Sequence, residues 1–312
     1  MTAHDDISTA FGNTPLVRLN HVTEGAGATV WAKLEFYNPA SSVKDRLGVA
    51  LINAAEASGE LRPGGTIVES TSGNTGIALA AIGAARGYNV VLTMPASMSK
   101  ERRALLKALG AELVLTDPYK GMTEAVERAQ QIVAERPGAV WVRQFENEAN
   151  PAIHIATTGP EIWDDTEGGV DVFVAGVGTG GTVTGVGRYL KERKPTVKIV
   201  AVEPADSPLL TEGRAGGHRI QGIGPNFVPP ILDRSVIDEV IDVEFPDAIA
   251  VTRDLAAREG ILAGMSAGAA VWAALEIARR PEHAGQQIVV IIPDSGERYL
   301  TTTIYEDPQP ES

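Results

Sequence analysis

Residues 170–194 read VDVFVAGVGTGGTVTGVGRYLKERK, and this stretch decides the fold class of the chain. An apolar run of strand length ends in a glycine-rich turn, and the turn opens a segment with helical spacing. Parallel strands need a crossover connection, and a helix that begins directly after a strand supplies one. The stretch therefore predicts one strand and one helix of a parallel β-sheet.

The same alternation continues along most of the chain. It predicts strands at residues 66–69, 89–94, 111–116, 140–144, 170–175, 198–202, 236–243 and 287–292. It predicts helices at residues 75–86, 99–109, 122–136, 183–194, 246–258 and 267–279. Near-continuous apolar strands between helices are typical of a parallel sheet covered on both faces. We therefore expect an α/β fold, interrupted by a long Gly- and Pro-rich loop at residues 204–230 of the kind that usually serves function.

Composition narrows the class of protein. The chain has 312 residues, which suggests two domains. Acidic residues outnumber basic ones, 40 to 27, and the net charge of −13 argues against a nucleic-acid partner. The absence of cysteine excludes disulfides and thiolate metal sites, and it fits a reducing cytoplasm. The longest apolar runs are about half a membrane span, so we expect a cytoplasmic protein with no membrane segment.

The turn Gly178–Thr182 has the composition of an anion-binding site. Glycine lets the backbone approach a ligand closely, and the N–H groups at a helix start bind anions. Thr179 and Thr182 add hydroxyl donors. A tight turn with no ligand is the simpler alternative.

A dinucleotide site is a second alternative for the same turn. Gly176, Gly178 and Gly181 match G-x-G-x-x-G, and Glu203 follows 22 positions after Gly181, where a ribose-binding acid is expected. By itself the glycine pattern does not separate a dinucleotide from a single phosphate.

A second turn, STSGNTG at residues 70–76, also lies between a predicted strand and a predicted helix. It gathers hydroxyl, amide and helix-start N–H donors at one point, which is what binding a carboxylate requires. Ser, Thr and Asn are also favoured as helix caps for structural reasons alone. One cap residue would suffice, so the pattern favours a ligand.

Lys44 stands in NPASSVKDR, residues 38–46, where a polar loop opens into an apolar helix. A lysine is usually a solvated surface charge. A partly desolvated lysine has a lowered pKa and can form imines or act as a base. The spacing of residues leaves both possibilities open.

Taken together, these motifs resemble the fold-type II pyridoxal-phosphate enzymes, and among them the cysteine synthase (O-acetylserine sulfhydrylase) family. The resemblance runs from GNTPL at residue 12 to GERYL at residue 296, with NPASSVKDR, TSGNTG, GVGTGGT, QGIG and GMSAG in the family's order. It implies a tryptophan synthase β-like fold of two domains, each a mostly parallel twisted sheet covered by helices. The dinucleotide alternative explains neither Lys44 nor the TSGNTG turn.

The resemblance also implies roles for single residues. Lys44 matches the lysine that holds pyridoxal 5′-phosphate covalently and then serves as the general base. Ser266 matches the partner of the pyridine nitrogen, and a helix cap is its structural alternative. The cofactor phosphate is matched by Gly178, Thr179, Gly180, Gly181 and Thr182. The cofactor hydroxyl is matched by Asn74, and the substrate carboxylate by Thr71, Ser72, Asn74, Thr75 and Gln144. No metal ligands are expected.

The sequence departs from the family pattern at three places. Ser70 stands where many relatives have proline or another small residue. Ala267 replaces a second serine that is common after Ser266, and Pro225-Asn226 follows QGIG where small residues are usual. None of these touches a matched role, but the last departure could alter the shape of the pocket.

The implied reaction is β-replacement of the acetoxy group of O-acetyl-L-serine by sulfide, with ping-pong kinetics through an α-aminoacrylate. Alternatives are a cystathionine β-synthase acting on serine and homocysteine, an O-phosphoserine sulfhydrylase with Arg214 or Arg219 as the cation, and a cofactor-free binding protein.

The resemblance further implies an assembly and two moving parts. Residues 1–47 with 148–312 would form the larger, cofactor-binding domain, and residues 48–147 a smaller mobile one that grips the substrate, with the active site in the cleft. A homodimer is expected, and so is binding of the C-terminal tail of serine acetyltransferase.

Overall fold

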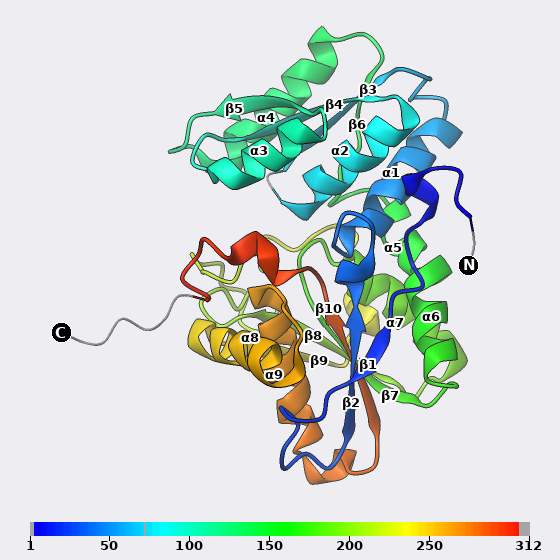
Figure 1. Cartoon of the computed structure of the whole chain (residues 1–312), viewed down its shortest axis with the longest axis vertical. Helices are drawn as coiled ribbons and strands as arrows, with labels where there is room; N and C mark the ends of the chain where they lie inside the picture. The colour runs from blue at the N-terminus through cyan, green and yellow to red at the C-terminus, as the bar shows by residue number, and fades with distance from the viewer. Residues whose placement is uncertain (1–2, 72, 306–312) are drawn as a thin grey trace, which may run out of the picture. The chain divides into compact units, whose positions relative to one another are not determined.

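The computed structural model describes residues 3–71 and 73–305, which form two compact units (Figure 1). The first unit contains residues 3–12 and Asn38–Ile153. The second contains Asn13–Tyr37 and residues 154–305. Each unit has its own sheet and its own core. The predicted α/β class with two mostly parallel, helix-covered sheets is confirmed.

The first unit is built on a four-stranded parallel sheet in the order β5-β4-β3-β6. Its strands are β3 (Thr66–Ser70), β4 (Asn89–Pro95), β5 (Glu112–Thr116) and β6 (Ala139–Trp141). Its helices are η1 (Ile7–Thr9), α1 (Lys44–Ala57), α2 (Asn74–Arg86), α3 (Lys100–Ala108), α4 (Gly121–Glu135) and α5 (Ala149–Ile153).

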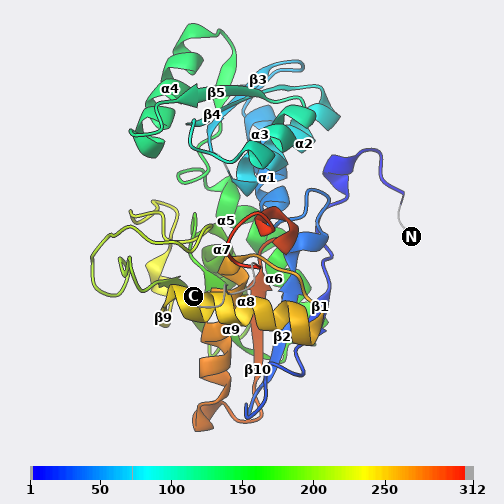
Figure 2. The same cartoon turned by 60° about the vertical axis from the view of Figure 1, so that its left-hand side comes forward.

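The two faces of this sheet are covered by different helices (Figures 1 and 2). Ile67 packs into a cluster with apolar residues of α1 and α2. Val68, the next residue along β3, packs instead against Ala129 and Ile132 of α4. Neighbouring strand residues point to opposite faces, so the adjacent apolar residues Ile67 and Val68 are buried on opposite sides of the sheet.

The second unit has a six-stranded sheet in the order β1-β2-β10-β7-β8-β9. Only the β1–β2 pair is antiparallel. The strands are β1 (Leu16–Arg18), β2 (Thr29–Leu34), β7 (Val170–Gly176), β8 (Lys198–Pro204), β9 (Glu239–Val243) and β10 (Gln287–Ile292). The helices are η2 (Glu35–Tyr37), α6 (Gly159–Asp165), α7 (Gly181–Arg193), η4 (Arg234–Val236), α8 (Phe245–Glu259), α9 (Met265–Ala278), η5 (Pro281–His283) and η6 (Gly296–Tyr299), with a π-helical turn η3 at His154–Thr158.

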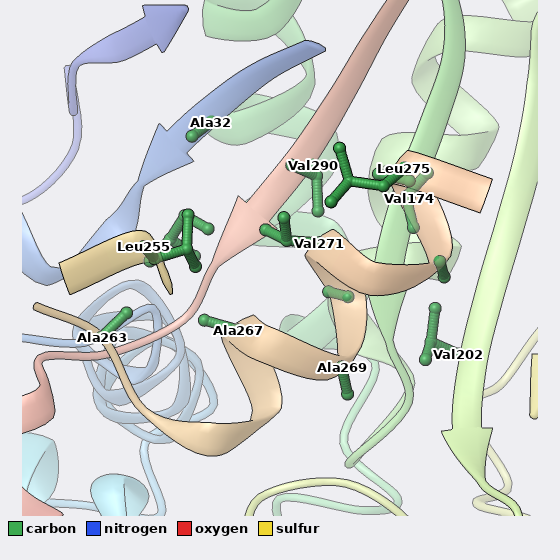
Figure 3. Packing of buried hydrophobic residues seen from close by; sticks show 14 of the residues in the cluster. Ala32, Val174, Val202, Leu255, Ala263, Ala267, Ala269, Val271, Leu275 and Val290 are labelled. Atoms are coloured by element: carbon green, nitrogen blue, oxygen red, sulfur yellow. The ribbon is translucent and has the colours of Figure 1, made fainter. Parts of the chain in front are cut away.

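Helix α9 is apolar over most of its circumference because it packs between α8 and the sheet. Glu276, near its end, is partly exposed and pairs with Arg279. Figure 3 shows Val271 and Leu275 of this helix beside Val174 of β7 and Val290 of β10. A helix enclosed in this way places its first turn, which carries Ser266, in a rigid setting.

The predicted loop at residues 204–230 is confirmed as a segment without regular structure between β8 and η4. Figure 2 shows it as long yellow-green loops beside β9. The Glu203 carboxylate accepts hydrogen bonds from the backbone N–H groups of Leu210 (2.8 Å) and Thr211 (2.9 Å). The loop is therefore tied to the end of β8.

Candidate active site

The glycine-rich turn joins β7 to α7 in a conformation that only glycine adopts easily. Gly180 has φ +85° and caps α7, in the left-handed region that a Cβ disfavours. A Cβ on Gly178 would lie 2.5 Å from the carbonyl oxygen of Gly222. The first N–H groups of α7 have no partner within the helix. The turn therefore presents donors to an anion.

Two threonines add hydroxyl groups to this turn. Thr179 is buried, and its Oγ1 lies 3.5 Å from the N–H of Gly181. The Thr182 hydroxyl lies 3.2 Å from Nε2 of His154, whose Nδ1 lies 2.8 Å from the hydroxyl of Thr158. No motif in the sequence indicates a role for His154. Its contact with the turn arises because a π-helical turn and α7 pack together.

Ser266 lies in the first turn of α9 and is buried. A Cβ on Gly222 would lie 3.5 Å from its Oγ, and the carbonyl of Gly222 closely approaches Gly178. The structure thus brings the glycine turn, residue 222 and Ser266 into one region of the second unit. A hydroxyl and an anion-binding turn, both on helix starts, fit the pyridine nitrogen and phosphate of the expected cofactor.

Glu203 is not available as a ribose-binding acid. Its two oxygens accept hydrogen bonds from Leu210 and Thr211 at 2.8–3.0 Å. The G-x-G-x-x-G pattern therefore lacks the acidic partner that a dinucleotide needs.

The two arginines considered for a phosphoserine pocket also have partners. The guanidinium of Arg214 lies 3.1 Å from Glu212. That of Arg219 lies over the ring of Phe245, 3.8 Å from its centre. These contacts weaken the case for a phosphorylated substrate.

In the first unit, Thr71 directly follows β3, and Gly73 is the residue before α2. The hydroxyl of Thr71 accepts a hydrogen bond from the N–H of Gly73 at 3.2 Å. The Thr75 hydroxyl donates to Oε1 of Gln144 at 2.6 Å. Asn74 is the first residue of α2. Ser72 lies outside the described residues.

Lys44 is the first residue of α1 and is half-buried. The preceding loop is held by Asp45, whose carboxylate accepts from the N–H of Ala40 at 2.5 Å and from the hydroxyl of Ser42 at 3.4 Å. Ser42 in turn accepts from the N–H of Lys44 at 3.2 Å. These bonds fix the backbone from which the lysine side chain extends.

One buried acid in the first unit is not indicated by any sequence motif. Glu69, near the end of β3, is 2% exposed. Burial raises its pKa to about 7, although hydrogen bonds from Ser70, Trp141 and Gln144 act in the opposite direction. The only signal that the sequence offers is a charged residue directly after the apolar pair Ile67 and Val68 in a predicted strand.

The predicted site residues are thus distributed over both units. Lys44, Thr71, Asn74, Thr75 and Gln144 belong to the first, and Gly178–Thr182 and Ser266 belong to the second. Within residues 3–71 and 73–305 no three His, Asp or Glu side chains gather as a set that could bind a metal. None of the described helices combines the length and apolar character needed to cross a bilayer.

Comparison with known proteins agrees with this geometry. Residues 7–294 match the family model described as pyridoxal-phosphate dependent enzyme. Cysteine synthase A of Escherichia coli K12 is 53% identical over 97% of this chain and 96% of its own length. The crystal structure of a cysteine synthase from Entamoeba histolytica superposes with a TM-score of 0.96 at 46% identity, covering 100% of this chain and 93% of that one. That of an O-ureido-L-serine synthase gives 0.94 at 45% identity, with 100% and 98% covered. On this evidence the chain belongs to the pyridoxal-phosphate dependent enzymes and, within them, to the cysteine synthase family.

Proposed function

We propose that this chain converts O-acetyl-L-serine and sulfide into L-cysteine and acetate with pyridoxal 5′-phosphate as cofactor. The observation that carries the proposal is the Thr75–Gln144 hydrogen bond of 2.6 Å, which brings together two residues from distant parts of the sequence that would bind the substrate carboxylate. The same unit carries Lys44 at the start of a helix. A pocket for an amino-acid carboxylate and a lysine that can take a proton are what β-replacement on an amino acid needs.

The residues of the second unit suit the cofactor. Gly178–Thr182 would hold its phosphate through N–H and hydroxyl groups, and Ser266 would meet its pyridine nitrogen. When bound, the cofactor supplies an electron sink for the negative charge that develops at the substrate α-carbon. A hydroxyl beside the nitrogen, in place of a carboxylate, permits a neutral ring and a weaker sink. That suits a reaction in which the leaving group departs soon after the α-proton.

The first unit would bind the substrate and transfer the proton. Thr71, Asn74, Thr75 and Gln144, together with Ser72, would bind the carboxylate, and Asn74 would also bind the cofactor hydroxyl. Lys44 would hold the cofactor covalently and, when its amine is free, would take the α-proton of the substrate as general base. Acetate would leave before sulfide arrives, so ping-pong kinetics are expected.

A substrate panel tests the function. Acetyl-, phospho- and free serine are each combined with sulfide and with homocysteine, because similarity to an O-ureido-L-serine synthase shows that this fold serves more than one reaction. We expect turnover of acetylserine with sulfide to exceed every other pair. Faster turnover of free serine with homocysteine, or intersecting initial-rate patterns, would contradict the proposal. Lys44→Ala should abolish turnover and keep the fold, with borohydride reduction and peptide mapping as the check of the lysine.

We further propose that residues 48–147 move on substrate binding and exclude water from the reacting atoms. Scattering profiles that stay the same when an amino acid is added would argue for a rigid site. A cytoplasmic homodimer is the proposed assembly, since symmetric dimers are the commonest oligomers. A monomer mass in light scattering at working concentration would refute the dimer.

The carboxylate pocket also supports binding of the C-terminal tail of serine acetyltransferase, because capture of a terminal carboxylate is a recurring mode of recognition. A peptide that ends in isoleucine should compete with O-acetylserine. Initial rates that are unchanged at about millimolar peptide, where even weak binding saturates, would exclude this partner.

A further inference from the structure

Glu69 joins two segments of the first unit that meet at the carboxylate pocket. Its Oε1 accepts hydrogen bonds from the N–H of Ser70 (2.8 Å) and from the indole Nε1 of Trp141 (3.1 Å). Its Oε2 accepts from the N–H of Gln144 (3.1 Å). Ser70 is the last residue of β3 before the turn, and Gln144 lies three residues beyond β6. One side chain therefore contacts both sides of the pocket.

The carboxylate acts where the regular sheet ends. The β3–β6 ladder pairs Val68 with Trp141 and ends with a bond of 3.2 Å from the N–H of Val142 to the carbonyl of Val68. Arg143 then turns the backbone out of the strand with φ +52°. A left-handed residue can direct successive N–H groups toward one point and make an anion site. Here the backbone of Arg143 and Gln144 is hydrogen-bonded to Glu69.

Gln144 is held at three atoms as a result. Its N–H is bound by Glu69, its carbonyl accepts from Nδ2 of Asn150 (2.9 Å), and its Oε1 accepts from the hydroxyl of Thr75 (2.6 Å). An amide whose oxygen is engaged offers its NH₂ group. Because the Thr75 hydroxyl gives its proton to Gln144, Thr75 can donate to a ligand only through its backbone N–H. The orientation of Gln144 thus decides which donors face a carboxylate.

We propose that Glu69 is a positioning residue for substrate recognition. By binding the backbone N–H groups of Ser70 and Gln144 at once, it holds the side-chain amide of Gln144 in place to receive the substrate carboxylate. This inference rests on the proposed function. It assigns to Glu69 no contact with the substrate. It requires two acceptor oxygens, because the donors approach both of them.

Glu69→Gln tests this requirement, since the amide keeps the shape of the side chain but turns one acceptor into a donor that faces an N–H group. Two matched variants serve as controls. Trp141→Phe removes one donor to Oε1 and leaves the bond to Gln144 intact. Glu112→Gln makes the same chemical change at a half-exposed, ion-paired position of the same sheet.

Calorimetry on the holoenzymes, at about pH 8.5 where a Glu69 with a pKa of about 7 is ionised, compares L-serine, which has the carboxylate, with ethanolamine, which lacks it. Glu69→Gln weakens the hydrogen bond from the N–H of Gln144 to the buried carboxylate, so Gln144 is held less firmly and L-serine binding should weaken about tenfold. Both controls should stay within about threefold of wild type. Ethanolamine affinity should not change. The KM for O-acetylserine should rise more than kcat falls, because the carboxylate is bound in the ground state and in the transition state alike.

Glu69→Asp, which keeps the charge, replaces Glu69→Gln if the latter does not fold, and an intermediate loss of L-serine affinity is expected. Unchanged L-serine affinity in a folded Glu69 variant, or an equal loss for ethanolamine, would overturn the inference and leave the proposed function standing. A wild-type chain that neither binds L-serine nor converts O-acetylserine would overturn both.

Discussion

Gly178 is a position in the glycine-rich turn at which a single methyl group would meet backbone directly. Alanine there would place Cβ 2.5 Å from the carbonyl oxygen of Gly222. That oxygen belongs to the backbone and cannot rotate away, so the turn and the segment at 222 must separate by several tenths of an ångström. Overpacking of this kind costs about 1–3 kcal/mol.

The chain provides two controls for Gly178→Ala in the loop that follows β8. A methyl group on Gly217 would meet no atom within 4 Å, and this residue does not have positive φ, so Gly217→Ala should be neutral. Gly213 has φ +70° and equally open surroundings, so Gly213→Ala isolates backbone strain, about 1–2 kcal/mol. Gly178→Ala then reports the steric overlap, Gly213→Ala reports the backbone strain, and Gly217→Ala reports the effect of adding a methyl group alone.

The measurements are thermal unfolding and cofactor affinity of the three variants. Gly178→Ala should lower the melting temperature by about 2–10 °C. It should also bind pyridoxal 5′-phosphate more weakly than Gly213→Ala does, because the displaced N–H groups are those that we propose for the cofactor phosphate. A Gly178→Ala enzyme with wild-type melting and cofactor affinity would show that the turn does not form the phosphate site.

Two further predictions concern buried charges. Glu69 has a folded pKa of about 7 against an ordinary 4.5, so the stability it contributes is fully present below about pH 4.5 and is lost as the pH rises through about 7. The loss is about 3 kcal/mol, and urea unfolding at several pH values should show it in wild type and not in Glu69→Gln; parallel pH profiles would refute it. Lys33 is fully buried and bonded to Glu161 (3.0 Å), Asp165 (3.1 Å) and the carbonyl of Thr14 (2.7 Å). Lys33→Met should cost about 3–5 kcal/mol in the same assay because it removes the cation that neutralises Glu161 and Asp165, and a loss below about 1 kcal/mol would mean that water solvates these acids instead.

Strong periodicity made most elements predictable. The strand predicted at 66–69 is observed at Thr66–Ser70, and the helix predicted at 75–86 is observed at Asn74–Arg86, which ends at Gly87 with φ +73°. The boundary errors have local causes. The strand predicted at 140–144 ends at Trp141, because Arg143 takes a left-handed conformation, which an arginine in the sequence does not indicate. The strand predicted at 236–243 begins at Glu239, since Arg234–Val236 form a 3-10 turn capped by Asp233.

Two strands at the start of the second unit escaped prediction. Leu16–Arg18 is only three residues long and half-exposed, and Thr29–Leu34 mixes apolar residues with a lysine. Lys33 can lie in a buried strand only because Glu161 and Asp165, distant in sequence, neutralise it. Ion pairs between residues so far apart in the sequence cannot be predicted from the local pattern of apolar and polar residues.

The sequence by itself determined the alternation of strands and helices, the two glycine- and hydroxyl-rich turns, and the lysine at a helix start, since each depends on neighbours within a few residues. Only the tertiary structure decided that Gln144 is hydrogen-bonded to Thr75, that Glu203 binds the backbone of the loop after β8, and that Glu69 binds the N–H of Gln144. These contacts join residues that are remote along the chain or separated by a change of backbone direction. Hydrogen bonds of that kind depend on sheet register and on single left-handed residues, and local hydrophobic pattern carries no information about either.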